Sequence, residues 1–398
     1  MEHSLEKKLG ESINVNELAN APYPIYNRLR ASEPISWIAP LNMYWVTRHK
    51  DVVHILMDNT NFVVGTPESL IFDIFGENVL TLDGAEHIRL RMALRSTFAA
   101  NYVRDVLEPT IKKRVNQLID GFDFTARRVE LRASFASRLP VLVMLDLFGL
   151  PDKEEATLRP WYNSFEAALG NFERNEDISV LAKKNAQSFH ILIQEYIDKF
   201  RHTPQPGSLI SDLVHSPEKI SISDEEIRKN ALIVLFGGIS TVEALILDAI
   251  YALSKHPDAL LAVKQDTALL PQALEEVSRW LSPVQSATRH VKNNVTVSGV
   301  EFVAGDSVNC ILAAANRDPE VFSSPDSFDI NRSDVKRHIA FARGLHTCPG
   351  IHLARAEARI ALEQLFDRLP GCRMDPKETA LPQGYEFHQP HSLAFIWD

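Results

Sequence analysis

The segment from residue 221 to residue 257, SISDEEIRKNALIVLFGGISTVEALILDAIYALSKHP, constrains the fold more than any other part of the chain. Ser223 followed by Glu226 is the pattern of a capping box, and Pro257 closes the segment. The sequence therefore predicts one helix from about Ser223 to Ser254, roughly 48 Å long at 1.5 Å per residue. Its middle is apolar nearly all round, so we expect the central buried helix of a large helical body.

The middle of this helix carries polar residues and a pair of glycines. The polar positions that interrupt the apolar run are Ser240, Thr241, Glu243 and Asp248. They break it short of the roughly 18 residues that a membrane span needs. Gly237 and Gly238 each cost about 1 kcal/mol relative to alanine inside a helix, so tight packing, a bulge or the close approach of another group is expected there. Thr241 lies four residues after Gly237, on the same face, so its hydroxyl should point into the space that the glycines leave.

The remaining segments predict a mainly α protein with a smaller β-rich lobe. Apolar residues recur at three- and four-residue intervals through most of 82–281, which is typical of helices. Alternating runs at 34–39 and 43–48 predict a hairpin, a second β-rich stretch follows Pro283, and the C-terminal YEFHQPHSLAFIWD is a further candidate hairpin. No flexible linker divides the chain, so we predict a single domain over residues 1–398 whose β segments form one sheet. The predicted β-rich lobe comes mainly from about 30–65, 284–312 and 370–398, and the helical lobe comes from the remainder.

Composition excludes several classes of function. Hydrophobic residues make up 45% of the chain and charged residues 24%, as in a globular protein. The net charge of -10 disfavours nucleic acid as a partner. The polar N-terminal segment lacks the apolar core of a signal peptide, so we expect no membrane attachment. Three widely spaced cysteines argue against a disulfide framework and favour the cytoplasm.

One of these cysteines, Cys348, lies in the stretch FARGLHTCPGIHLARAE, directly before a proline. If a helix begins at about Pro349, Cys348 sits at the positive end of the helix dipole, which lowers a thiol pKa and favours the thiolate. Structural zinc would need about four protein ligands, and no Cys or His stands at that spacing. A single thiolate suits a heme that activates oxygen. A hydrolase-type nucleophile is the alternative, although no paired base is evident.

Five motifs in matching order make the chain resemble the cytochrome P450 family over almost its whole length. The cysteine-loop pattern Phe-x-x-Gly-x-His-x-Cys-x-Gly is matched by Phe341, Gly344, His346, Cys348 and Gly350. The segment GGISTVE resembles the family's oxygen-activation segment, with Thr241 as its threonine, and ANRDPEVFSSPDSFD is typical of bacterial members.

Two shorter motifs complete the resemblance. The family's Glu-x-x-Arg pair corresponds to Glu276 and Arg279, and Arg332 would complete their buried, structural ion network. The His-x-x-x-Arg motif corresponds to His87 and Arg91.

The resemblance implies a cytochrome P450 fold with a long central helix over heme b. Cys348 would be the axial iron ligand, with Phe341, Gly350 and Gly237 beside the heme. The heme propionates would be bound by His87, Arg91, Arg289 and His346. The implied substrate contacts are Ile233, Phe236, Gly237, Val284, Gln285, Ser286, Phe72, Phe75, Phe165, Phe387, the region of Phe172 and the tip at His388.

The implied activity is that of a monooxygenase, an oxidoreductase acting on paired donors with incorporation of molecular oxygen. It would hydroxylate or epoxidise a small to medium-sized hydrophobic organic substrate, using a ferredoxin or flavodoxin-type donor with its reductase. A monomer is expected, with basic residues near the cysteine as a docking patch, namely Arg343, Arg355 and Arg359. The alternatives are a peroxide-using enzyme, an atypical oxidative coupling, or, more remotely, a non-catalytic heme sensor.

Two departures from the family pattern affect the chemistry. Ser240 stands where most members have an acid before the threonine, so Thr241 with ordered water, or Glu243 in place of the acid, would have to supply protons. Glu243 could equally pair with a cation elsewhere. On this basis Ser240→Asp is expected to raise turnover or coupling. Pro349 has no N–H to donate to the cysteine sulfur, which should lower the heme potential. Ala342 stands where glycine is common.

Overall fold

The computed structural model describes residues 9–67, 69–171, 174–216 and 221–398. The chain divides into two compact units. Unit 1 takes in the residues up to Val64, Glu275–Cys348 and Pro382–Gln389. Unit 2 takes in Gly65–Leu274, Pro349–Leu381 and Pro390–Asp398.

Helices account for most of the described chain, as predicted. The helices are α1 Val15–Asn20, α2 Pro22–Ser32, α3 His49–Met57, α4 Leu70–Phe75, α5 Gly84–Leu94, α6 Ala100–Tyr102, α7 Glu108–Asp120, α8 Leu139–Phe148, α9 Glu155–Leu169, α10 Glu176–His202, α11 Leu209–Val214, α12 Asp224–Gly237, α13 Ser240–Lys255, α14 Pro257–Gln265, α15 Leu270–Trp280, α16 Leu312–Ala315 and α17 Ile351–Arg368. The strands are β1 Ile35–Ile38, β2 Met43–Val46, β3 Phe62–Val63, β4 Arg128–Glu130, β5 Ala287–Val291, β6 Val295–Val297, β7 Val300–Phe302, β8 Ser307–Cys310, β9 Arg373–Met374, β10 Pro382–Gln383, β11 Gln389–Pro390 and β12 Ala394–Ile396.

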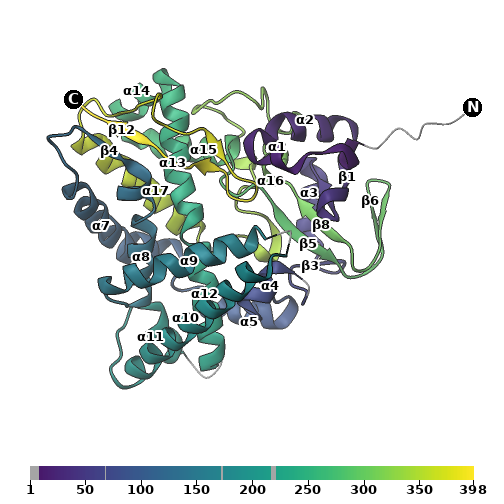
Figure 1. The fold of residues 1–398 in the computed structure, drawn as a ribbon, viewed down its shortest axis with the longest axis horizontal. Coiled ribbons are helices and arrows are strands. Elements are labelled where there is room, and N and C mark those ends of the chain that lie inside the picture. The colour runs from purple at the N-terminus through teal and green to yellow at the C-terminus, as the bar shows by residue number, and fades with distance from the viewer. Residues whose placement is uncertain (1–8, 68, 172–173, 217–220) are drawn as a thin grey trace, which may run out of the picture. The chain divides into compact units, whose positions relative to one another are not determined.

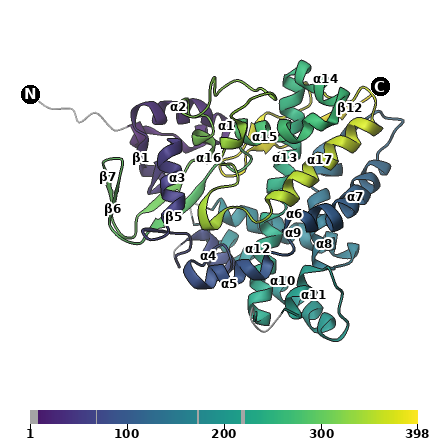
Figure 2. The same ribbon diagram turned by 180° about the vertical axis from the view of Figure 1, so that it is seen from behind.

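Unit 1 is built on a five-stranded sheet with the order β1-β2-β8-β5-β3. β1 and β2 form the predicted antiparallel hairpin, and β8 continues the sheet parallel to β2. β5 is antiparallel to both β8 and β3. The sheet thus joins strands from residues 35–63 with strands from residues 287–310, which confirms that part of the prediction. A separate hairpin, β6–β7, extends away from the sheet in both views (Figure 1, Figure 2).

Both faces of this sheet are covered because side chains alternate along each strand. Trp45 of β2 packs in one apolar cluster with Ile25, Tyr26 and Leu29 of α2. The next residue, Val46, belongs to a second cluster that contains residues of α3. One strand therefore holds a helix on each face.

The predicted C-terminal hairpin is wrong, as is the prediction that the last β segments join the main sheet. β12 pairs instead with β4 and β9 in a three-stranded sheet of unit 2, and β11 pairs with β10. Pro390 ends the pairing of β11 because proline has no N–H to donate. Gly384, at φ 120°, turns the chain sharply between β10 and β11.

The core of unit 2 is a set of packed helices around α8 and α13. α8 has the sequence LPVLVMLDLF and is buried on nearly all sides, as such an apolar helix must be. α17 packs along α7 and α13, and the ribbons of α17 and α7 lie side by side in both views (Figure 1, Figure 2). α10 packs against α9, α11 and α12.

The central helix is interrupted rather than continuous. α12 ends at Gly237 and α13 starts at Ser240, so the predicted helix is present on both sides of an interruption at the two glycines, where a bulge or close approach was expected, and the capping box at Ser223 is confirmed. A Cβ on Gly238 would lie 2.8 Å from the sulfur of Met144, so this glycine permits close packing on α8. A Cβ on Gly237 would meet nothing within 4 Å. The two glycines therefore do different things, one packing tightly and the other leaving open space.

By length and composition alone, Asp224–Lys255 is long and apolar enough to cross a membrane. However, 78% of its most apolar window is buried inside the protein. It is the one such segment among the described residues, and it has the burial of a core helix.

A buried ion network lies in unit 1 at the end of α15. Arg279 donates to both carboxylate oxygens of Glu276 at 2.7 and 2.8 Å, and both side chains are fully buried. Arg332 donates to the same carboxylate at 3.2 Å. Arg279 also donates to the carbonyls of Asn316, Pro325 and Ser327, so the network fixes the long loop that follows α16.

We expect Glu276→Gln to lower the free energy of unfolding by about 3–5 kcal/mol, because it leaves the buried Arg279 guanidinium without a compensating charge and Arg332 with only Asp334, at 3.5 Å. The matched control is Glu378→Gln, whose partner Arg128 and own side chain are 47% and 56% exposed. The control should cost less than about 1 kcal/mol. Urea denaturation followed by circular dichroism measures both, and equal losses would contradict the structural role of the network.

Candidate active site

The three cysteines of the chain differ in how deeply they are buried. All three thiols are free, but Cys310 and Cys372 are buried and Cys348 is half-buried. Burial raises the pKa of Cys310 to about 12 and also raises the pKa of Cys372, which keeps both as neutral thiols. Cys348 is therefore the cysteine best placed to act as a thiolate ligand.

A tight loop in unit 1 presents Cys348. Its backbone N–H donates to the carbonyl of Phe341 at 2.9 Å, and the Thr347 hydroxyl donates to the carbonyl of Gly344 at 2.8 Å. Gly344 has φ 80°, and a Cβ there would lie 2.4 Å from the carbonyl oxygen of Leu56. Only glycine fits this position without moving backbone.

Ala342 lies in the same loop with φ 58°, in the left-handed region that alanine adopts at some strain. This conformation gives a physical reason for the glycine that is common in the family at this position. The helix after the loop, α17, begins at Ile351 with Gly350 as its N-cap. It thus begins two residues later than the predicted start at Pro349.

The predicted substrate contacts of unit 1 lie where residues 283–286 and residues 386–388 are joined by hydrogen bonds. Val284 forms an isolated antiparallel bridge with Phe387, and the N–H of His388 donates to the carbonyl of Pro283 at 3.0 Å. The Gln285 side-chain amide donates to the carbonyls of Leu281 and Ser282. Because Gln285 is buried and its N–H groups are used there, Val284 and Phe387 are the better candidates for contact with a hydrophobic molecule.

Glu386, a carboxyl that the sequence did not single out, also joins these two segments. The Ser286 hydroxyl donates to its side chain at 2.7 Å, and the Gln285 N–H donates to its carbonyl at 2.9 Å. Burial raises the pKa of Glu386 to about 7, and the Ser286 hydrogen bond only partly offsets this. No spacing in the sequence could have revealed it, because residues 286 and 386 meet only through the fold.

Two of the predicted propionate ligands, His87 and Arg91, share one face of α5 in unit 2. His87 is buried, and its Nδ1 lies 2.8 Å from the carbonyl of Val79, which orients the ring. Since a carbonyl only accepts, Nδ1 carries the proton. In unit 1, the predicted ligand Arg289 is a buried residue of β5 that donates to the carbonyl of Thr288, and His346 lies in the short 3-10 turn Gly344–His346.

The predicted oxygen-activation residues lie at the interruption of the central helix. The Thr241 hydroxyl donates to the carbonyl of Gly237 at 2.8 Å. Gly237 is exposed and Gly238 and Thr241 are half-buried, although Phe236, Ile239, Ser240 and Val242 are buried. The interruption therefore leaves one open, polar spot on an otherwise apolar helix.

Aromatic side chains form a cluster beside this spot, within unit 2. The ring centroid of Phe75 lies 5.8 Å from that of Phe165 and 5.1 Å from that of Phe236. Tyr162 stacks on Phe236 at 5.9 Å. Three of the predicted substrate contacts are thus brought together here. Ile233 is buried and Phe72 half-buried, and Phe172 lies outside the described residues.

Glu243 pairs with a cation, which was the alternative for this residue. Its carboxylate lies 2.5 Å from Nε of Arg132. Burial raises the pKa of Glu243, and the Arg132 guanidinium partly offsets that effect. Ser240 is also buried, and it bonds Tyr162 and Glu166 of α9.

The donor set fits a heme rather than a bare metal ion. Among the described residues, no group of three or more His, Cys, Asp or Glu side chains could hold a metal. Iron would therefore be bound by a porphyrin plus a single protein ligand, which a half-buried Cys348 can supply. Within unit 1, Arg289 and His346 are of the kind that binds a propionate, and within unit 2 the same holds for His87 and Arg91. The open space at Gly237, also in unit 2, suits a flat group or a small molecule.

Comparison with known proteins agrees with this donor set. The family model for cytochrome P450 matches residues 157–372, more than half of the chain. The chain belongs to the cytochrome P450 family. It is 30% identical to the mycinamicin IV hydroxylase/epoxidase of Micromonospora griseorubida over 94% of both chains, and 33% identical to the cytochrome P450 monooxygenase PikC of Streptomyces venezuelae over 90% of this chain and 86% of that one.

Structural similarity extends along the whole fold. The crystal structure of P450BioI in complex with an acyl carrier protein ligated to hexadec-9Z-enoic acid has a TM-score of 0.88 and 28% identity, and covers 96% of this chain and 99% of that chain. The predicted P450 fold class is therefore confirmed. The protein is an oxidoreductase of the monooxygenase class whose cofactor is heme b with a cysteine thiolate ligand.

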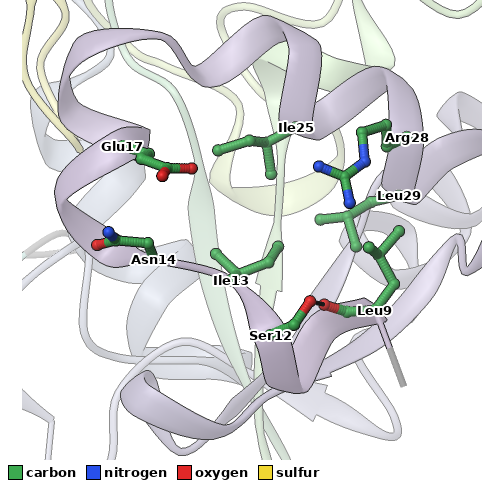
Figure 3. Close-up of a pocket in the computed structure, with 8 residues that line it drawn as sticks. All are labelled: Leu9, Ser12, Ile13, Asn14, Glu17, Ile25, Arg28 and Leu29. Carbon is green, nitrogen blue, oxygen red and sulfur yellow. Dashed lines mark hydrogen bonds between the residues drawn. The ribbon is translucent and has the colours of Figure 1, made fainter. Parts of the chain in front are cut away.

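A small pocket lies in unit 1 (Figure 3). It lies between the N-terminal turn, α1 and α2, with a volume of about 40 Å³. It is lined by Leu9, Ser12, Ile13, Asn14, Glu17, Ile25, Arg28 and Leu29. This volume holds a few water molecules at most, so the pocket is too small for an organic substrate.

We expect Gly344→Ala to destabilise the heme-bound protein by about 2 kcal/mol or more, because its Cβ would clash with the carbonyl of Leu56 at a positive φ. The paired variant Ala342→Gly should stay within about 1 kcal/mol of the wild type, since relief of strain offsets the added freedom of the unfolded chain. Urea denaturation compares the two. Similar losses in both variants would contradict the described loop.

Glu386 should make the protein less stable as the pH rises from about 5 to 7. Its folded-state pKa of about 7 lies above its usual value of 4.5, so the folded chain holds more protons in this window and stability falls with rising pH. Glu386→Gln should flatten that slope, measured by thermal unfolding at several pH values, while the exposed control Glu378→Gln should leave it as in the wild type. An unchanged slope in Glu386→Gln would refute the burial of this carboxyl.

Proposed function

We propose that this protein hydroxylates or epoxidises a small to medium-sized hydrophobic molecule at a heme held by Cys348, within one domain over residues 1–398. The observation that carries the proposal is the tight loop around Cys348, which presents the one cysteine of the chain that is not buried. The Thr241 hydroxyl at the interruption of the central helix supports the same reaction class.

The proposed roles of the residues follow from their chemistry. The heme, when bound, supplies the activation of dioxygen. Cys348 binds its iron as a thiolate. His87, Arg91, Arg289 and His346 neutralise and orient its propionates. Thr241 presents a hydroxyl that can hold a water molecule or pass a proton, and the apolar surroundings exclude bulk water.

The proposed substrate is hydrophobic because the predicted contacts are mostly apolar and aromatic. Phe75, Phe165 and Phe236 contribute rings in unit 2, and Val284 and Phe387 contribute apolar side chains in unit 1. Related structures carry a fatty acyl group on P450BioI and testosterone on CYP109E1. We therefore propose fatty acyl and steroid-like molecules as the first classes for a spectral binding screen.

Electrons are proposed to come from a ferredoxin or flavodoxin-type donor and its reductase. The basic patch expected for docking is weakened at one position, since Arg359 is held by Glu108 at 2.7 Å and by Glu363 at 2.9 Å. Arg343 and Arg355 are the other two basic residues proposed to take part in docking. We propose a cytoplasmic monomer that binds neither nucleic acid nor membrane. The grounds are the net charge of -10, the polar N-terminal segment and the three widely spaced cysteines.

A peroxide-using enzyme is the second candidate, and Ser240 is the observation that favours it. Peroxide brings oxygen already reduced by two electrons, so such an enzyme needs no external electron donor. An oxidative coupling reaction would need the same residues and differs only in substrate. A non-catalytic heme sensor would have no need for the Thr241 hydroxyl at the helix interruption.

We expect Cys348→Ser to abolish the absorption band that reduced heme-thiolate proteins show with carbon monoxide, because a hydroxyl does not ligate iron as a thiolate does. The control Cys372→Ala removes a buried thiol and should keep the band. Oxygen consumption with NADPH, ferredoxin and ferredoxin reductase, compared with turnover on hydrogen peroxide, then separates the two candidates. A retained band in Cys348→Ser would overturn the proposal.

A further inference from the structure

A polar cavity reaches the interrupted central helix within unit 2. It has a volume of about 230 Å³, enough for several water molecules. It is lined by Glu130, Arg132, Ala133, Ser137, Val141, Arg159, Tyr162, Asn163, Glu166, Ile239, Glu243 and His391. Glu130, Asn163 and His391 are exposed, whereas Tyr162, Ile239 and Glu243 are buried. The cavity therefore leads from the protein surface to the interruption between α12 and α13.

Ser240 is bonded to two of the residues that line this cavity, Tyr162 and Glu166. Its hydroxyl donates to Glu166 Oε1 at 2.9 Å and accepts from the Tyr162 hydroxyl, and its backbone N–H donates to the same tyrosine oxygen at 2.9 Å. Ser240 is 2% exposed. A buried serine is thus bonded to a carboxyl that faces the cavity, immediately before Thr241 in the chain.

The other charged groups around the cavity have structural partners. Glu243 is paired with Arg132, and Glu130 accepts the backbone N–H groups of Ala133 and Leu393 at 2.6 and 2.8 Å. Arg159 donates to the Ser137 hydroxyl at 3.3 Å. Burial raises the pKa of Tyr162 well above its ordinary range, so this phenol stays neutral while it donates to the Ser240 hydroxyl and accepts the Ser240 N–H. Glu166 is the carboxyl that combines contact with Ser240 and access to the cavity.

We infer that Glu166 replaces the acid that most members of the family have at position 240, and that it supplies protons from the water-filled cavity through Ser240 to the Thr241 site. The Glu166 carboxylate takes a proton from cavity water and then donates it to the Ser240 oxygen. In the same step the Ser240 hydroxyl, which donates to Glu166 in the structure, turns away and passes its own proton to a water molecule at the Thr241 hydroxyl. Neither residue changes its net charge over the cycle. The inference rests on the proposed function, because the protons serve the reduction of oxygen.

The first test does not depend on activity. Infrared difference spectra between the wild type and Glu166→Gln, both resting and heme-bound, identify the Glu166 carboxyl band as the one lost in the variant. That band should shift in Ser240→Ala, which removes its hydrogen-bond donor. The band lost in Glu155→Gln, a control on the same helix that pairs with Arg138 at 2.7 Å, should not shift. A Glu166 band that is unchanged in Ser240→Ala would overturn the inference.

The second test measures proton supply directly. With NADPH, ferredoxin and its reductase, and oxygen as the sole acceptor, Glu166→Gln should slow oxygen consumption about a hundredfold, the lower end of the range for loss of a general acid. Its solvent deuterium isotope effect should rise, because proton transfer becomes limiting. Glu155→Gln should stay within about twofold of the wild type, and Glu166→Asp should recover part of the rate. Equal behaviour of Glu166→Gln and Glu155→Gln would mean that the cavity is only structural.

Moving the carboxyl provides a rescue. Ser240→Asp, which the sequence alone favours as an improvement, would place a second carboxylate beside Glu166 in a buried site, where like charges repel. We therefore expect the single variant to be slower than the wild type and the double variant Ser240→Asp/Glu166→Gln to be faster than Glu166→Gln. A double variant no faster than Glu166→Gln would count against a relay at this position. The carbon monoxide band of each variant shows separately whether the heme-thiolate function stands.

Discussion

The interruption between α12 and α13 is the constraint on which the active-site side of unit 2 depends. The Tyr162 oxygen accepts the N–H of Ser240, and the Thr241 hydroxyl donates to the carbonyl of Gly237. Side chains therefore replace part of the helical hydrogen bonding. Insertion of side chains into the ladder is a recognised cause of helix kinks. The same change in hydrogen bonding brings the Thr241 hydroxyl to the open space at Gly237. It also lets Ser240 bond to Glu166, which lines a polar cavity. A local loss of helix is thus what makes the helix chemically useful.

Packing around the interruption explains why it stays in place. Gly238 lets Met144 of α8 approach closely, and an added Cβ would lie 2.8 Å from the Met144 sulfur. The aromatic rings of Phe75, Phe165 and Phe236 fill the space on another side. Because these groups are fixed by the helical core, the Thr241 hydroxyl is held by a rigid scaffold rather than by a mobile loop, as a positioned catalytic group requires.

Sequence patterns predicted what depends on local spacing. The helix phase of His87 and Arg91, the cap at Ser223 and the hairpin of β1 and β2 follow from intervals of three, four or two residues. Contacts between distant segments had no such signal. Glu166 comes to Ser240, and Glu386 to Ser286, only because separate segments fold together. The C-terminal hairpin failed for the same reason, since the partner of β12 is β4, far away in the sequence.

The position of the acid shows how one substitution can leave a reaction class intact. A carboxylate on the central helix, directly before the threonine, would have to be buried at the cost of desolvation. Serine at 240 avoids that cost and still offers a donor and an acceptor, while the carboxyl of Glu166 remains half-buried in contact with the cavity. Glu243 lies on α13, three residues after Ser240, but its charge is neutralised by Arg132. The charge needed for proton supply is therefore carried by α9, and the central helix contributes only hydroxyl groups.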